Sequence, residues 1–119
     1  MVSTQELLTG VYARFNARDV DAVLKAMHED VVWPNGMEGG WVHGHTGVRE
    51  YWTRQWGLID PHVEPVGFAT EADERIAVTV QQTVRDLGGK ILLDRRVEHV
   101  YLVEDGLIRS MAIREPDSE

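Results

Sequence analysis

The sequence predicts an α+β fold in which helices cover one side of a curled antiparallel sheet, and three observations lead to this class. Apolar residues recur at helical spacing over residues 7–59. Residues 63–114 instead alternate between apolar and polar side chains, as strands do. Glycine-containing turns at residues 87–90 and 104–106 predict hairpins. A cone-shaped sheet covered by three N-terminal helices is therefore expected, and the open end of such a cone is a natural pocket.

Two helices are expected before residue 31. Ser3 and Glu6 have the spacing of a capping box, and the helix that starts there runs to about Ala17. Its apolar face consists of Leu7, Leu8, Val11, Tyr12 and Phe15. Asp19 is a suitable N-cap for the second helix, which residues 28–30 end. The apolar face of the second helix consists of Val20, Val23, Leu24 and Met27.

A short strand, a loop and a third helix follow. Residues 31–33 form a β-rich run that the turn residues 34–36 stop. Residues 37–45 show no clear period and predict a loop. Thr46 can cap the third helix, which residues 60–61 close. Its apolar face consists of Val48, Tyr51, Trp52, Trp56 and Ile59.

Four strands are expected in the remainder of the chain, arranged as an antiparallel meander. They cover residues 63–70, 75–86, 91–103 and 107–114. Strands of about twelve residues twist and curl, which gives the sheet a concave side.

Composition limits the function. The chain has 119 residues and a net charge of -8, which predicts one domain over residues 1–119 and argues against binding to nucleic acid or to anionic membranes. It contains no cysteine, so thiol catalysis and cysteine-ligated zinc are excluded. No signal peptide and no apolar run of about 20 residues is evident. We therefore expect a cytoplasmic protein.

The long strand at residues 91–103 offers two faces, and charge decides between them. One face carries Asp94, Arg96 and Glu98, which would cost several kcal/mol to bury unless each were paired. The other face is therefore expected inside; it carries Arg95, Val97, His99, Tyr101 and Val103. On the last strand, Met111 and Ile113 are the apolar choice for the interior.

His99 then lies in the middle of a strand on an interior face, and three interpretations remain open. It is a neutral core histidine bonded to a neighbour, a pocket acid/base group, or a metal ligand. The acid/base interpretation makes His99 the candidate catalytic residue.

All four tryptophans fall within residues 33–56. Trp52 is expected in the core, whereas Trp33 and Trp56 either line a pocket or build the same core. Trp41 lies in the glycine-rich loop, as a lid over the pocket mouth or as an exposed dimer contact. His43 and His45 resemble a metal pair, but a transition-metal site needs a third ligand. A capping or loop-bonding role is favoured for one of them, and His43 is expected beside the pocket mouth; no metal is expected.

Three segments carry a resemblance to a known family. They are NARDVDAVLKAMHEDVVW, VHGHTGVREYW and VEHVYLVEDGLIRSM. Their order and spacing resemble the nuclear transport factor 2-like superfamily and, within it, the SnoaL-like proteins. The resemblance implies a cystatin-like roll of curled sheet and three helices, a deep pocket and a homodimer.

Known activities of the superfamily match the chain only in part. Where ketosteroid isomerases hold a carboxylate base before a proline, this chain has Trp33. Their oxyanion-site aspartic acid matches Glu98 or, with a hairpin one residue shorter, His99, and the interior-face argument favours His99. Their helix-one tyrosine falls near Val11, with Tyr12 turned by about 100°. Steroid isomerisation by that mechanism is not expected.

Two other enzyme classes give a similar result. The Asp–Arg–Asp set of limonene epoxide hydrolases matches Gln82, Val80 and Ile113, which lack the required chemistry. The SnoaL-like cyclases use a pocket His and an Asp. His99 matches their histidine, but Met111 and Ile113 provide no acid.

Two functions from different classes remain. The first is a cofactor-independent isomerase, cyclase or dehydratase for a small hydrophobic cyclic or aromatic carbonyl metabolite, with His99 as acid/base. Its ligand contacts are predicted at Trp33, His43, Tyr51, Trp56, Gln82, Tyr101, Met111 and Ile113. The second is a non-catalytic carrier, sensor or accessory dimer. A third alternative is protein binding through the outer sheet face at Thr79, Gln81 and Thr83, the face expected to form the homodimer.

Overall fold

The computed structural model describes residues 3–36, 38–71 and 73–115. The elements follow one another in the order α1 (Thr4–Asn16), α2 (Val20–Leu24), β1 (Met27–Pro34), β2 (Trp41–His43), α3 (Gly44–Trp56), β3 (Asp60–Thr70), β4 (Ile76–Arg85), β5 (Ile91–Glu104) and β6 (Leu107–Arg114). Helices therefore dominate the first half of the chain and long strands the second, which confirms the predicted α+β class.

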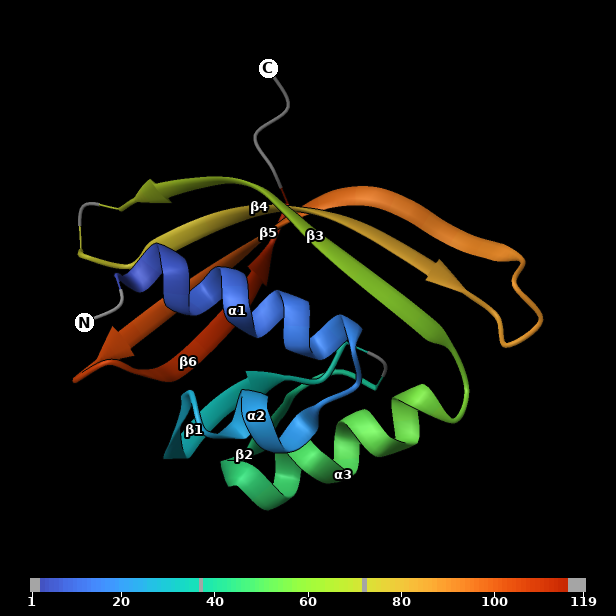
Figure 1. Cartoon of the computed structure of the whole chain (residues 1–119), viewed down its shortest axis with the longest axis horizontal. Helices are drawn as coiled ribbons and strands as arrows, with labels where there is room; N and C mark the ends of the chain where they lie inside the picture. The colour runs from blue at the N-terminus through green and yellow to red at the C-terminus, as the bar shows by residue number, and fades with distance from the viewer. Residues whose placement is uncertain (1–2, 37, 72, 116–119) are drawn as a thin grey trace.

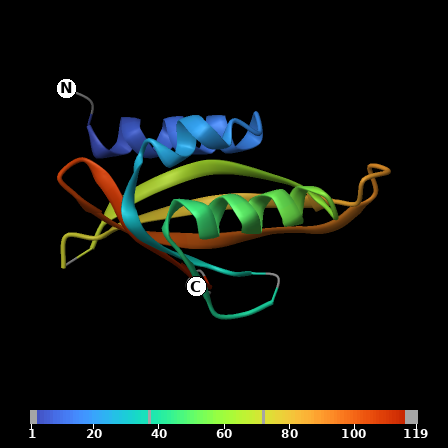
Figure 2. The same ribbon diagram turned by 90° about the horizontal axis from the view of Figure 1, so that it is seen from below.

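The strands of the described residues form one curled, unclosed sheet of six strands in the order β2-β1-β6-β5-β4-β3. The last four strands in sequence form the predicted antiparallel meander. β1 extends it by pairing in parallel with β6, and β2 pairs antiparallel with β1. In Figure 1 the long strands β3, β4 and β5 arch over the helices, which lie on the concave side of the sheet. Figure 2 shows α1 and α3 from a second direction.

The second helix is shorter than predicted, because the residues after it join the sheet. α2 ends at Leu24, and Met27 starts a strand that also includes His28, Glu29 and Asp30. Met27 pairs with Ile108 of β6, and the N–H group of Ile108 donates to the carbonyl of Ala26 at 2.8 Å. Met27 is buried in this pairing. Met27 follows Val23 by four residues, a spacing that also fits one face of a helix. The local pattern therefore predicted a helix where the chain forms a strand.

The predicted loop at residues 37–45 contains a strand, and the third helix starts earlier than Thr46. β2 pairs with the end of β1, with Trp33 opposite Val42. The N-cap of α3 is His43, whose side chain makes no capping hydrogen bond. The turn into the helix uses Gly44 at φ +73°, a backbone conformation that glycine adopts without strain. The loop prediction failed because a three-residue strand has too few residues to show alternation.

The core lies between the helices and the concave side of the sheet. Trp52 contacts Phe15 and Trp33 in edge-to-face geometry, at ring-centre distances of 5.0 and 5.5 Å. Such contacts stabilise a fold beyond the area that they bury. The prediction that Trp52 belongs to the core is confirmed.

Asn16, the last residue of α1, attaches that helix to the edge strand β3. Its Nδ2 donates to the carbonyl of Val63 at 2.8 Å, and its Oδ1 accepts from the N–H of Val63 at 3.0 Å. The side chain thus takes the place of a neighbouring strand at the edge of the sheet. The same contact holds α1 at a defined height above the sheet.

We predict that Asn16→Ala lowers the free energy of unfolding by about 2 kcal/mol, because two backbone groups of Val63 lose their partner. The measurement is urea unfolding followed by tryptophan fluorescence. Gln5→Ala, at an exposed position of α1, is the matched control and is expected to change stability by less than about 0.5 kcal/mol. Equal stability of the two variants would contradict the role assigned to Asn16.

Candidate functional site

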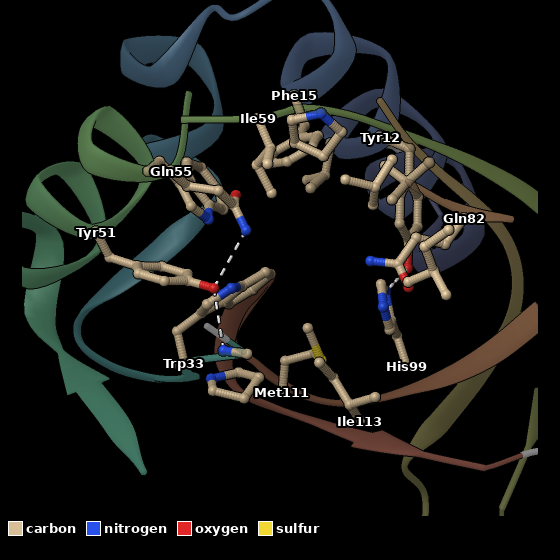
Figure 3. Close-up of a pocket in the computed structure, with 18 of the residues that line it drawn as sticks. Tyr12, Phe15, Trp33, Tyr51, Gln55, Ile59, Gln82, His99, Met111 and Ile113 are labelled. Carbon is tan, nitrogen blue, oxygen red and sulfur yellow. Dashed lines mark hydrogen bonds between the residues drawn. The ribbon is translucent and has the colours of Figure 1, made fainter. Parts of the chain in front are cut away.

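The concave side of the sheet and the helices enclose a cavity of about 240 Å³. Figure 3 looks into it, with the labelled side chains arranged around an open centre. Residues from α1, β1, α3 and the strands β3 to β6 line it, together with two residues of the connecting segments, Gly36 and Ile59. They are Val11, Tyr12, Phe15, Trp33, Pro34, Gly36, Tyr51, Trp52, Gln55, Ile59, Pro61, Val63, Gln82, Val84, Leu93, His99, Tyr101, Met111 and Ile113. Most of them are apolar, which suits a hydrophobic ligand.

A chain of three hydrogen-bonded side chains forms the innermost polar part of the cavity. The hydroxyl of Tyr101 donates to the hydroxyl oxygen of Tyr12 at 2.7 Å. The oxygen of Tyr12 lies 2.8 Å from Nδ1 of His99. All three side chains are buried, and His99 is only 7% exposed. The chain joins α1 to the middle of β5.

Burial keeps all three groups of this chain uncharged. Loss of hydration lowers the pKa of His99 to about 4. Burial, together with the neighbouring Tyr101, raises the pKa of Tyr12 well above its ordinary value, and burial raises the pKa of Tyr101. Near neutral pH, His99 is therefore a neutral imidazole bonded to the hydroxyl group of Tyr12, and both tyrosines keep their protons.

The direction of the hydrogen bonds determines which ring nitrogen of His99 carries its proton. Because Tyr101 donates to Tyr12, the proton of Tyr12 is available for Nδ1 of His99. A neutral imidazole that accepts at Nδ1 carries its proton on Nε2. Nε2 has no hydrogen-bond partner among the described residues. It also keeps some accessible surface, because Nε1 of Trp56 is the only fully buried side-chain nitrogen or oxygen without a partner among those residues. Nε2–H is therefore a hydrogen-bond donor open to the cavity.

The opposite side of the cavity has a second polar group, built around Tyr51 of α3. The oxygen of Tyr51 accepts from the N–H of Gly36 at 3.0 Å and from Nε2 of Gln55 at 3.2 Å. Figure 3 shows Tyr51 and Gln55 across the open centre from His99 and Gln82. The cavity therefore has two polar ends, with apolar walls such as Trp33, Met111 and Ile113 between them.

The structure brings seven of the nine predicted site residues to this cavity. They are His99, Trp33, Tyr51, Gln82, Tyr101, Met111 and Ile113. His99 and Tyr101 face inward as the charge argument required, while Glu98 on the other face binds Arg114 at 2.7 Å. Ile113 is 45% exposed and so belongs to the outer part of the cavity.

His43 and Trp56 lie elsewhere, contrary to expectation. His43 is exposed on β2 and does not line the cavity. Trp56 packs against Phe15 and Trp52, and the guanidinium of Arg18 lies 5.1 Å from its ring centre. Trp56 shares a helical stripe with Trp52, but it occupies the last turn of α3 and faces α1 instead. Trp41 is 53% exposed and also does not line the cavity.

Tyr12 and Gln55 belong to the site, although the sequence does not predict them there. The sequence predicts Tyr12 on the apolar face of its helix, and its one-residue offset from the family's tyrosine gives no reason to expect it in the pocket. In the structure both Val11 and Tyr12 line the cavity, and Tyr12 bonds His99. For Gln55 a signal was present, because it follows Tyr51 by one helical turn and therefore shares its face.

The pair His43 and His45 does not form part of a metal site in the described residues, where no group of three or more potential ligands occurs. Nε2 of His45 instead lies 2.9 Å from the carbonyl oxygen of Met27. One histidine of the pair thus bonds the backbone, although the backbone is that of β1. None of the helices in the described residues is long and apolar enough to cross a membrane.

The sequence profile of the SnoaL-like domain family matches residues 8–111. The chain belongs to this family. No curated protein matches its sequence. The family assignment confirms the resemblance predicted from the sequence segments.

Solved structures agree with the assignment. The protein TerC, co-crystallised with polyporic acid, is 28% identical over 93% of this chain and 89% of that chain, with a TM-score of 0.80. An ntf2-like protein of unknown function from Burkholderia pseudomallei is 28% identical over 98% and 92% of the two chains, with a TM-score of 0.82. A Mycobacterium tuberculosis protein in complex with estradiol-17beta-hemisuccinate is 20% identical over 90% and 88%, with a TM-score of 0.76. The nuclear transport factor 2-like fold is thereby confirmed.

The buried His99 makes the stability of this SnoaL-like protein depend on pH. Its pKa falls from 6.5 to about 4 on folding, so the unfolded chain binds a proton more readily between these values. The folded state therefore has its full stability with respect to His99 above pH 6.5, and it loses this stability as the pH falls towards 4. We predict that protonation of His99 in the unfolded chain lowers the free energy of unfolding by about 2 kcal/mol between pH 7 and pH 5. The total decrease is about 3 kcal/mol once the pH is below 4.

The measurement is urea unfolding of the wild type and His99→Gln at pH 7 and pH 5. The variant is expected to lose less stability than the wild type between the two pH values, by about 2 kcal/mol. An identical loss in both proteins would show that folding does not lower the pKa of His99.

Proposed function

We propose that this protein is a cofactor-independent enzyme that acts on a small hydrophobic cyclic or aromatic carbonyl compound by moving a proton next to the carbonyl group. The observation that carries the proposal is the chain Tyr101–Tyr12–His99, which ends in a neutral imidazole with its Nε2–H open to an apolar cavity. A fixed donor in a site of low polarity stabilises negative charge on a ligand oxygen more strongly than water does.

The reaction follows from this donor. A proton leaves the carbon beside the carbonyl group and is taken up by water, and the electron pair moves onto the carbonyl oxygen to form an enolate. Nε2–H of His99 donates to that oxygen as its charge develops, so His99 acts on the acid side of the chemistry. With a double bond next to that carbon, the enolate takes the proton back from water at the far end of the double bond. With a second carbonyl group, the enolate forms a carbon–carbon bond to it, and the resulting alkoxide takes the proton. With a hydroxyl group on the neighbouring carbon, the enolate expels hydroxide, which takes the proton and leaves as water. These outcomes are isomerisation, cyclisation and dehydration.

Among the remaining polar residues, Tyr101 takes a role that differs from the expected contact with the ligand. The hydroxyl of Tyr101 is committed to Tyr12, so Tyr101 positions the chain rather than the substrate. Tyr12 in turn holds the imidazole of His99 in the tautomer that donates at Nε2. Gln82 is the amide on the same side of the cavity as His99 and orients the carbonyl group beside it.

Ligands of similar structures support a hydrophobic ring compound as substrate. TerC was co-crystallised with polyporic acid, and the Mycobacterium tuberculosis protein was crystallised in complex with estradiol-17beta-hemisuccinate. The lining of the present cavity is predominantly apolar and includes the aromatic rings of Phe15, Trp33 and Trp52. Aromatic walls of this kind favour flat or cyclic ligands.

A second candidate function is non-catalytic binding of the same class of compound. It is favoured by the lack of any carboxylate among the described residues that line the cavity. Without one, proton removal depends on water and therefore on an acidified carbon. A carrier or sensor needs no such base.

We also propose that the protein forms a homodimer through the outer face of β4 and β5. This face carries a polar network in which Asp94 accepts from Gln81 at 2.8 Å and from Thr83 at 3.1 Å.

Light scattering after size-exclusion chromatography is expected to give twice the chain mass. Thr79→Arg, which places a bulky charge on this face, is expected to give the mass of one chain, and a monomeric wild type would contradict the proposal.

The proposed chemistry predicts hydrogen–deuterium exchange at the carbon beside the carbonyl group of 1-tetralone, a small cyclic aromatic ketone. We expect the wild type to accelerate exchange in D2O, measured by NMR. His99→Leu is expected to reduce the rate by about 10²-fold to 10³-fold, the usual effect of removing an oxyanion donor. Tyr12→Phe is expected to reduce it by about tenfold, since His99 loses the group that holds its tautomer.

The control variant is Gln5→Leu, which lies on the exposed side of α1 and is expected to exchange at the wild-type rate. Exchange by His99→Leu at the wild-type rate would remove His99 from the mechanism. A wild type that binds 1-tetralone but exchanges no faster than buffer would favour the non-catalytic function.

A further inference from the structure

The polar groups of the cavity lie at two opposite ends. Gln82 and His99 form one end, and Gln55 with Tyr51 forms the other (Figure 3). From this arrangement we infer that the ligand is an uncharged ring compound with a hydrogen-bonding oxygen at each of two opposite ends. Gln55 selects for the second oxygen. The identity of the first oxygen as a carbonyl rests on the proposed function, whereas the need for the second does not.

At the first end, two side chains are available to the same ligand oxygen. Nε2–H of His99 opens to the cavity, and the amide of Gln82 makes no side-chain hydrogen bond to another described residue. A ligand that displaces water from this end leaves both groups without partners unless it brings an acceptor. Such a loss costs enough to govern ligand choice.

At the second end, the amide of Gln55 is only half used. Its Nε2 donates to the oxygen of Tyr51 at 3.2 Å, which fixes the orientation of the amide. Its Oε1 accepts no hydrogen bond from the described residues and is not fully buried, and Figure 3 shows the side chain of Gln55 turned towards the open centre of the cavity. Oε1 is therefore an acceptor held in place for a donor. A ligand hydroxyl group supplies that donor, whereas a methyl group does not.

The lining explains why the ligand is uncharged. None of the described residues that line the cavity is Asp, Glu, Lys or Arg. The nearby Arg18 lies outside the lining, where it binds Asp60 and stacks on Trp56. A carboxylate in this cavity would lose its hydration without gaining a cation, at a cost of several kcal/mol in general.

A cavity with a polar group at each end binds different ligands from a cavity that only prefers apolar rings. Apolar walls alone would favour a methyl group over a hydroxyl group at the far end of the ligand, because the methyl group is easier to remove from water. The position of Gln55 reverses this order. The order of binding of two ligands of equal size therefore decides the question.

The experiment is calorimetric titration at pH 6.5 with three ketones that share the 1-tetralone ring. They are 6-hydroxy-1-tetralone, 6-methyl-1-tetralone and 1-tetralone-6-carboxylate, in which position 6 lies at the opposite end from the carbonyl group. We expect the hydroxyl compound to bind about tenfold or more tightly than the methyl compound, and the carboxylate to bind more weakly than both.

Two variants test which residue binds which end of the ligand. Gln55→Leu is expected to abolish or reverse the preference for the hydroxyl compound while leaving the methyl compound within about threefold of its wild-type affinity. Gln82→Leu is expected to weaken the hydroxyl and methyl compounds by a similar factor, because both carry the carbonyl group. Gln5→Leu, a change of the same type on the exposed side of α1, is the control that leaves all three affinities unchanged.

Three results would overturn the inference: equal or tighter binding of the methyl compound by the wild type, tightest binding of the carboxylate, or no binding of any of the three. Because titration needs no turnover, the preference for the hydroxyl compound can hold in a protein that does not catalyse exchange. That combination would reject the proposed catalysis and retain the ligand class.

Discussion

The hydrogen-bonded chain Tyr101–Tyr12–His99 connects the first helix to the longest strand, and the rest of the site depends on that connection. Three polar groups are buried there, and each would be costly without a partner. Their mutual hydrogen bonds, at 2.7 and 2.8 Å, satisfy them only if α1 stays at one height and one rotation above β5. Asn16, one helical turn after Tyr12, sets the same height through the edge strand β3. The two contacts together hold α1 away from the sheet and leave the cavity open.

The curl of the sheet follows from irregular pairing between its strands. β1 joins β6 in parallel, and its register shifts between Met27 and Val32. β3, an edge strand, pairs with β4 with a register shift between Pro65 and Gly67. Irregularities of this kind bend strands and increase twist. The edges are thereby brought round the helices without meeting, and a cavity with one open side results.

Residues whose environment is decided within their own strand could be predicted from the sequence. The inward direction of His99 and Tyr101 followed from the charges on the opposite face of β5. The alternation of β4 placed Gln82 with Val78 and Val80, and this side faces the cavity or core. These inferences needed only the two-residue period of a strand and the cost of burying charge.

Residues whose environment depends on distant partners could not be predicted in this way. Tyr12 and His99 are 87 positions apart, and no local pattern states which side of α1 meets β5. Met27 satisfies a helical and a strand period alike, and its pairing with Ile108 decides between them. Trp56 lies on the stripe of Trp52, yet Phe15 and Arg18 cover it at the end of the helix. In each case the deciding contact comes from an element that is remote in the sequence.

The contrast between the surface and the cavity narrows the kind of molecule that this protein recognises. The chain carries a net charge of -8, which repels anions approaching from solution. Inside, burial lowers the pKa of His99 to about 4 and thus keeps the lining uncharged near neutral pH. A protonated His99 would attract an anionic ligand, but among the described side chains only the hydroxyl of Tyr12 bonds its imidazole in place of water. The neutral state is therefore the stable one, and it makes His99 a donor to an uncharged carbonyl oxygen rather than a partner for a carboxylate.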